Sequence, residues 1–174
     1  MKIFKHTFFI SLVVSSLIII SRFKFDVAPI LLVLVGGFIA NFFPYLDFIV
    51  NAFLINPQSQ SSEEIKSLFL RREYKKLISL IDSNSVSENK PTINSAHFQV
   101  ILLLLGFYFI TTKPTLFGFG FLLSLIFNLI YRLHSSMPFY HQWFWIFKNP
   151  VSLSFVKMWL YINIAFGVIY IVLV

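Results

Sequence analysis

Five apolar stretches divide the 174-residue chain, and they constrain its fold more than any other feature. Each comes close to the ~20 residues that an α-helix needs to cross the hydrocarbon core of a bilayer. In lipid every backbone N–H and C=O group must be paired within the protein, so such stretches form helices. The stretches cover residues 7–25, 27–43, 97–112, 116–133 and 153–174. We therefore predict an all-α, polytopic membrane protein with about five transmembrane helices, in a single membrane domain over residues 1–174.

The composition supports this membrane interpretation and excludes several functional classes. Hydrophobic residues make up 57% of the chain and charged residues only 12%, whereas soluble domains carry about 25% charged residues. The net charge of +7 does not indicate binding to nucleic acid, because most basic residues flank apolar stretches, where they meet lipid headgroups. The chain has no Cys, which excludes disulfides and thiolate ligands, and it lacks a phosphate-binding loop and a serine-nucleophile motif.

The second apolar stretch is too long for one straight span. It stays apolar from residue 27 to residue 55, and Pro44 interrupts it, with Asn41 before and Asp47 after. Proline removes a backbone donor and kinks or breaks a helix. We therefore predict a span over 27–43, then a break, and an interfacial or re-entrant helix over 44–55. The alternative is four spanning helices together with re-entrant or interfacial segments.

Residues 56–96 form the one sizeable polar region, which we predict to be a cytoplasmic loop with a basic amphipathic helix over about 61–82. A capping box, Ser61-x-x-Glu64, marks the start of this helix. The helix can lie on an anionic membrane surface or pack against the protein's own helices, and the sequence favours neither. Its apolar face carries Leu70, Tyr74, Leu77, Ile78 and Ile81, and the largely opposite, lipid-surface face carries Arg71, Arg72, Lys75 and Lys76.

The distribution of basic residues predicts the orientation of the chain. With the N-terminus inside, ten Lys and Arg residues lie in the inner segments and three in the outer ones. Cytoplasmic loops carry such an excess. The first stretch, which follows Lys2 and Lys5, resembles a signal peptide, but no clear cleavage site follows it, and we predict an uncleaved first helix. The expected location is the cell (inner or plasma) membrane, with a cytoplasmic N-terminus.

This topology brings several ionisable residues to one membrane face. His6 precedes the first span, Asp47 follows the break, His97 opens the third span, His134 closes the fourth, and His141 lies in the next loop. Ionisable groups at membrane depth are costly and tend to be paired or functional. Two or three His and one Asp suit a divalent metal such as Zn²⁺, which can activate water for hydrolysis. The candidate ligands are His6, Asp47 and His97, with His134 as a weaker one.

Each of these residues also has a purely structural interpretation. His6 can flank the membrane in the headgroup layer. Asp47 can cap the short helix after the break or pair with a basic residue, and His97 can cap the third span. His134 and His141 fit an interfacial position.

Two further features near the membrane face have alternative interpretations. The aromatic run at residues 139–147 fits either an interfacial belt or the lining of an acyl-chain groove. Arg132 fits an anchor that extends its charge to the cytoplasmic surface. The polar residues within the apolar stretches, Asn41, Asp47 and Asn128, are too few to line a transport pathway.

A family resemblance runs through the same residues. Lys5-His6-Thr7, Gly36-Gly37…Pro44-Tyr45-Leu46-Asp47 and Ser95-Ala96-His97 resemble motifs of the bacterial LexA-regulated, membrane-bound metal-dependent hydrolase family, and Gly118-Phe119-Gly120 to Asn128 and Met137-Pro138…Trp145 follow its layout. The resemblance implies a small polytopic fold and a metal site near the cytoplasmic face. Carried over position by position, it assigns the metal to His6, Asp47 and His97.

The chain departs from that family at the central motif. The family has Pro-Asp-x-Asp-His, whereas this chain reads Pro44-Tyr45-Leu46-Asp47-Phe48, so no general-base carboxylate can be assigned. Two functions therefore follow from the sequence. One is a hydrolase-like membrane protein with an eroded metal site at the cytoplasmic face. The other is a non-catalytic membrane protein that binds lipid, including anionic headgroups, or partner subunits.

Overall fold

The computed structural model describes residues 2–22, 26–84, 92–112, 115–147 and 149–173, and this part of the chain is helical without any strand. The elements follow the apolar and polar stretches of the sequence closely. In chain order they are α1 (Lys2–Arg22), α2 (Val27–Ala40), α3 (Phe43–Val50), the π-helix η1 (Asn51–Ile55), α4 (Gln60–Leu70), α5 (Tyr74–Asn84), α6 (Ala96–Thr112), α7 (Leu116–Ser135), the 3₁₀-helix η2 (Met137–Gln142) and α8 (Leu153–Leu173).

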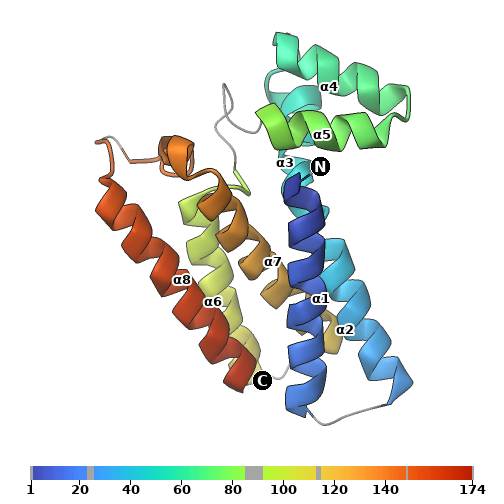
Figure 1. The fold of residues 1–174 in the computed structure, drawn as a ribbon, viewed down its shortest axis with the longest axis vertical. Helices are drawn as coiled ribbons and strands as arrows, with labels where there is room; N and C mark the ends of the chain where they lie inside the picture. Colours follow the sequence, from blue (N-terminus) through green and yellow to red (C-terminus); the bar gives the residue numbers. More distant parts are fainter. Residues whose placement is uncertain (1, 23–25, 85–91, 113–114, 148, 174) are drawn as a thin grey trace.

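Five helices, α1, α2, α6, α7 and α8, run side by side with alternating direction (Figure 1). Among the described residues, four segments are long and apolar enough to cross a membrane: Ile3–Ser21, Val27–Ile55, Leu116–Ser135 and Leu153–Leu173. The apolar α6 has 17 residues, which is the lower limit for a span. The prediction of an all-α, polytopic membrane protein is confirmed. The N-terminus, α4, α5 and η2 lie at one end of the bundle, the N-terminal face, and the C-terminus lies at the other (Figure 1).

Helix α7 is the centre of the bundle. In its most apolar window 67% of residues are buried, against 22–33% in the other three candidate spans. It contacts α1, α2, α6 and α8, and side chains from all of these helices join its hydrophobic core. The other spanning helices therefore present most of their surface to lipid, which explains why their apolar residues show so little helical periodicity.

Two glycines make the contact between α2 and α7 close. A Cβ atom on Gly36 would lie 2.3 Å from the carbonyl oxygen of Phe117, and one on Gly120 would lie 2.3 Å from the carbonyl oxygen of Val33. Transmembrane helices gain no hydrophobic driving force from each other in lipid, so small residues that let backbones approach stabilise their packing. This contact fixes how α2 lies on the central helix.

The predicted break in the second stretch is present, slightly earlier than expected. Helix α2 ends at Ala40, residues 41–42 form a turn, and α3 begins at Phe43 with Pro44 in its first turn. Proline has no N–H to donate to the Ala40 carbonyl, and its ring crowds that carbonyl, so the regular ladder stops there. The chain does not turn back as a re-entrant segment: α3 and η1 continue to the N-terminal face (Figure 1).

The polar region folds as a hairpin of two helices, α4 and α5, rather than as one helix over 61–82. Helix α4 ends in a Schellman motif, in which the N–H of Glu73 donates to the Leu68 carbonyl (3.0 Å) and that of Arg72 to the Phe69 carbonyl (3.1 Å). Arg72 adopts the left-handed conformation this motif requires (φ 59°). The predicted capping box is also shifted, because Ser59 is the N-cap and its Oγ accepts from the Ser62 N–H (3.2 Å).

Replacing Gly36 tests the α2–α7 contact. We expect Gly36→Ala to destabilise the protein by about 1–3 kcal/mol, because the new methyl group meets backbone that cannot move aside. The measurement is the thermal unfolding temperature of the purified protein in detergent.

Gly118→Ala is the matched control on α7. Its new Cβ would approach side chains and no backbone, namely the edge of the Phe109 ring (3.0 Å) and Thr115 Oγ1 (3.4 Å), so the unfolding temperature should change little. Equal effects of the two substitutions would contradict the assignment of the close contact to Gly36.

Candidate functional site

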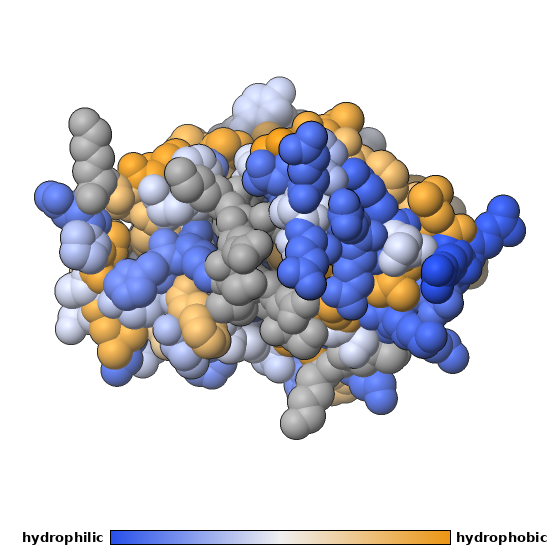
Figure 2. All heavy atoms as spheres, turned by 90° about the horizontal axis from the view of Figure 1, so that it is seen from above, coloured by the Kyte–Doolittle hydropathy of each residue, from blue (hydrophilic) through white to orange (hydrophobic). Residues whose placement is uncertain are grey.

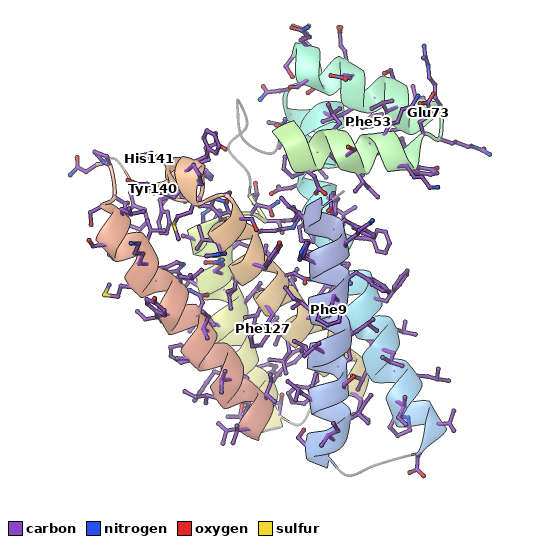
Figure 3. All side chains as sticks on the ribbon, viewed as in Figure 1. Phe9, Phe53, Glu73, Phe127, Tyr140 and His141 are labelled. Atoms are coloured by element: carbon purple, nitrogen blue, oxygen red, sulfur yellow. The ribbon has the colours of Figure 1, made fainter. Side chains whose placement is uncertain are left out.

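The predicted His and Asp residues lie on helices whose ends meet the same face of the bundle. His6 lies near the start of α1, Asp47 in α3, His97 at the start of α6, and His134 at the end of α7, and these helix ends all lie at the N-terminal face (Figure 1). His141 lies on η2 at the same face. Figure 3 shows that it stands on the side away from Glu73, which marks the outer end of the α4–α5 hairpin. A shared face does not by itself make a site, and the local geometry of each residue decides its role.

Asp47 holds the chain segment that leads into α6. Its Oδ1 accepts from the backbone N–H of Thr92 (3.0 Å), and its Oδ2 accepts from the N–H groups of Ile93 (2.7 Å) and Asn94 (3.0 Å). The Asn94 side-chain amide donates to the Pro44 carbonyl (2.9 Å) beside it. Asp47 is 9% exposed, so this buried carboxylate is stabilised by backbone donors from a segment 45 to 47 residues away.

His6 and His97 have different neighbours. The His6 ring stacks on Tyr131 of α7, with ring centroids 5.5 Å apart. The His97 ring packs edge-on against Trp145 at 5.5 Å, and its Nε2 lies 3.3 Å from the Oγ of Ser95. His134 is exposed in the last turn of α7, where a basic residue is favourable next to the negative end of the helix dipole.

Potential metal ligands do not cluster among the described residues. Within residues 2–22, 26–84, 92–112, 115–147 and 149–173, no three His, Asp or Glu side chains come together as potential ligands. Three backbone donors already take up most of the about four lone-pair sites of the Asp47 carboxylate. The set of His6, Asp47 and His97 shares a face but lacks a common centre. Binding of a divalent metal stays a prediction.

Sequence reasoning missed a polar link that joins four elements at this face, α1, α3, α5 and α7. The guanidinium of Arg132 lies 4.3 Å from the centroid of the Tyr45 ring, and the Tyr45 hydroxyl donates to Asp82 Oδ1 (2.9 Å). Asp82 Oδ2 also accepts from the Phe4 N–H (3.3 Å). The sequence predicted that Arg132 extends its charge to the cytoplasmic surface. Instead, Arg132 is 4% exposed and lies buried. The sequence signal for this link was Asp82, an acidic residue in the otherwise basic α5.

The link holds α5 against the bundle, and the apolar face of α5 packs there as well. Leu77 (4% exposed) and Ile81 (2%) pack in a second core with Tyr45, Phe48 and Ile65. Of the two predicted roles for the amphipathic helix, packing against the protein's own helices therefore holds for this part of its apolar face. Leu70 and Tyr74 remain outside that core.

The turn between α4 and α5 forms an exposed basic surface that we call the hairpin tip, residues 70–76. Leu70 (73% exposed) and Tyr74 (52%) stand among the exposed Arg71, Arg72, Lys75 and Lys76. Lys76 Nζ lies 2.6 Å from Glu73 Oε2, and this contact holds the pKa of the Glu73 carboxyl below its usual range. Four basic residues and one acidic residue leave the tip with a net charge of +3.

The aromatic run at residues 139–147 lines a groove. A cavity of 140 Å³ lies between this segment and helices α6 and α8, and its walls are almost entirely apolar. The run therefore contributes to an apolar groove at this face, and the acyl-chain occupant stays a prediction. Its lining includes His97, Val100, Phe144, Ile146, Phe147 and Trp159.

No protein family, curated protein or solved structure matches the chain.

Asp47→Ala tests the structural role of Asp47. We expect a loss of about 2 kcal/mol of stability, because three backbone N–H groups lose their acceptor and the one of Asn94 is buried. Thermal unfolding in detergent measures it. The loss should be the same with and without a chelator, and elemental analysis of the wild-type protein should find no stoichiometric zinc.

Asp26→Ala is the control, because Asp26 is an exposed N-cap of α2 whose side chain makes no capping hydrogen bond. Its unfolding temperature should match the wild type. The structural role would be overturned by about one transition metal per chain that is lost in both Asp47→Ala and His97→Ala.

Proposed function

We propose that this integral membrane protein is a non-catalytic lipid-binding protein that holds anionic headgroups at the hairpin tip. The tip lies at the N-terminal face, at one end of the candidate spans found among the described residues. The proposal is supported by the charge of the tip, by its backbone conformation and by its exposed apolar side chains.

The charge of the tip suits the surface of an anionic bilayer. Basic residues near such a surface each contribute ~1 kcal/mol of attraction, which falls off within a Debye length. Three of the basic residues are exposed, so they can contact headgroups directly: Arg71, Arg72 and Lys75. Figure 2, which looks onto the N-terminal face, shows hydrophilic side chains gathered over the hairpin, with hydrophobic side chains around them.

The backbone of Arg72 is the observation that carries the proposal. A left-handed conformation costs a non-glycine residue about 1–2 kcal/mol, and a Schellman motif usually has glycine at this position. Here an arginine with an exposed side chain takes that position. Backbone strain of this kind is common at functional sites. Binding of an anionic group by the Arg72 side chain would explain why this position holds arginine and not glycine.

The exposed apolar residues of the tip fit the same role. Leu70 and Tyr74 are more than half exposed beside the positive charges, which is the side-chain mixture of an interfacial membrane segment. The Tyr74 ring is supported by other aromatic rings. It contacts Phe69 (6.3 Å between centroids), and Phe69 contacts Phe53 of η1 (5.6 Å). The tip is therefore a supported surface that can enter a headgroup layer.

The metal-dependent hydrolase is the alternative function, and the resemblance to that family stays a prediction. The shared face of His6, Asp47 and His97 supports it. The hydrogen bonds that occupy Asp47 weigh against it, and for that reason we favour lipid binding.

Arg72→Gly separates function from stability. This substitution removes one positive charge and also relieves the left-handed strain, so we expect an unchanged or higher unfolding temperature together with about fivefold weaker enrichment of anionic lipid. The protein is reconstituted in vesicles of equal phosphatidylglycerol and phosphatidylcholine and extracted in mild detergent. The co-purifying lipids are then quantified by mass spectrometry.

Arg71→Gly is the matched control, because Arg71 has a right-handed conformation (φ −76°). It should weaken lipid enrichment to a similar degree but lower the unfolding temperature. Glycine relieves no strain in a right-handed conformation, and it loses more conformational entropy on folding than arginine does. Arg72→Lys should retain the enrichment. Wild-type enrichment in both glycine variants would rule out lipid binding at the tip.

The charge asymmetry supports a cytoplasmic position of the N-terminal face in the cell membrane. We expect an alkaline phosphatase fused after Val174 to be active and a green fluorescent protein fused at the same place to be dark. The reverse pattern would place the hairpin tip outside.

A further inference from the structure

A line of buried polar side chains crosses the middle of the bundle, and neither the metal prediction nor the lipid-surface proposal uses it. We call it the polar seam: Ser11 and Ser15 of α1, Asn41 beside α2, and Ser124 and Asn128 of α7. All five side chains are at most 3% exposed. The Asn128 amide donates to Ser11 Oγ (3.2 Å) and to Asn41 Oδ1 (3.2 Å), so one side chain of the central helix joins the other two elements.

The seam lies at the middle of the candidate spans. Ser11 falls near the centre of Ile3–Ser21, Asn41 at the centre of Val27–Ile55, and Ser124 near the centre of Leu116–Ser135. Hydrocarbon offers no hydrogen-bonding partner at this depth, so each polar group has to be paired within the protein or with a ligand.

Two atoms of the seam lack a partner within the part of the chain that the structure describes. They are Asn128 Oδ1 and Ser124 Oγ, and both residues are fully buried. The hydroxyls of Ser15 and Ser124 both approach Gly37, whose added Cβ would lie 2.5 Å and 3.0 Å from them. Glycine at this position therefore lets both hydroxyl groups pack directly against the backbone of α2.

A cavity reaches the seam from the lipid side. It has a volume of 270 Å³, close to the ~300 Å³ at which small-ligand pockets begin. Leu12 (43% exposed), Val35 (47%) and Phe38 (50%) form its rim on the surface of α1 and α2. The complete lining is Phe8, Ser11, Leu12, Ser15, Leu34, Val35, Phe38 and Asn41, so three residues of the seam lie at the inner end of an apolar pocket.

We propose that this pocket binds an uncharged lipid alcohol, with its chain against the apolar walls and its hydroxyl on the polar seam. A hydroxyl can donate and accept, as can the serine hydroxyls and the carboxamide of Asn41 that it meets. No charged residue lines the pocket among the described residues, so an anionic headgroup has no counter-ion there. The occupant is a long-chain alcohol of the bilayer interior, because only an uncharged molecule reaches this depth at low cost.

A pair of matched probes tests the proposal on the full-length protein in phosphatidylcholine nanodiscs. One is a photoreactive, alkyne-tagged hexadecanol, and the other is its methyl ether, which has the same chain but no hydroxyl donor. Peptide mapping after illumination should find the alcohol on residues 8–15 and 34–41. Labelling by the alcohol should exceed labelling by the ether about fivefold, as expected for one net hydrogen bond.

Three variants locate the binding. Ser15→Ala keeps the pocket but removes a hydroxyl, and should reduce labelling by the alcohol to the level of the ether. Val35→Trp fills the pocket and should abolish labelling by both probes. Leu32→Trp, on the same helix and similarly exposed (46% against 47%) but outside the lining, should label as the wild type does.

Equal labelling by the two probes would overturn the proposal and leave only a groove for an apolar chain. Undiminished labelling in Val35→Trp would also overturn it. Arg72→Gly should not affect the labelling, so this result and the lipid enrichment at the hairpin tip are independent of each other.

Discussion

The backbone contact between α2 and α7 governs the arrangement of the bundle. Gly36 and Gly120 let the two helices approach until carbonyl oxygens lie where side chains would otherwise be. In lipid this packing replaces the hydrophobic effect as the main source of helix association. Because α2 lies so close to the central helix, Asn41 comes within hydrogen-bond distance of Asn128, and Tyr45, one helical turn further on, comes under Arg132.

Two polar connections then attach the N-terminal face to this bundle. Asp47 binds the segment before α6, and Asp82 connects α5 to Tyr45 and to the backbone at Phe4. In each case a carboxylate joins parts of the chain that are far apart in sequence. The face is therefore fixed by carboxylates that work as acceptors of structural hydrogen bonds, which is a different use of acidic residues from the metal ligation that their location suggests.

Hydrophobicity predicted the helices and the common face, because a bilayer leaves few alternatives for apolar stretches of this length. It could not predict the role of Asp47, since its partners are backbone groups of residues 92–94 and backbone donors have no sequence signature. The single helix over 61–82 was wrong for a related reason. Nothing in the sequence marks Arg72 as a left-handed residue where a glycine would have signalled the end of α4. The spacing of Ser11 and Ser15, one turn apart, was the visible sign of the polar seam.

The hairpin is carried at the end of a helical segment of fixed length. Val27–Ile55 has 29 residues, more than the ~20 that cross about 30 Å of hydrocarbon, and a turn at residues 41–42 divides it. Covalent geometry thus sets the height of the hairpin tip above the bilayer midplane, whereas the lipids set the height of their own headgroups. Under the lipid-binding proposal, a thicker bilayer brings headgroups up to the tip and a thinner one draws them away. The same contact would then report membrane thickness.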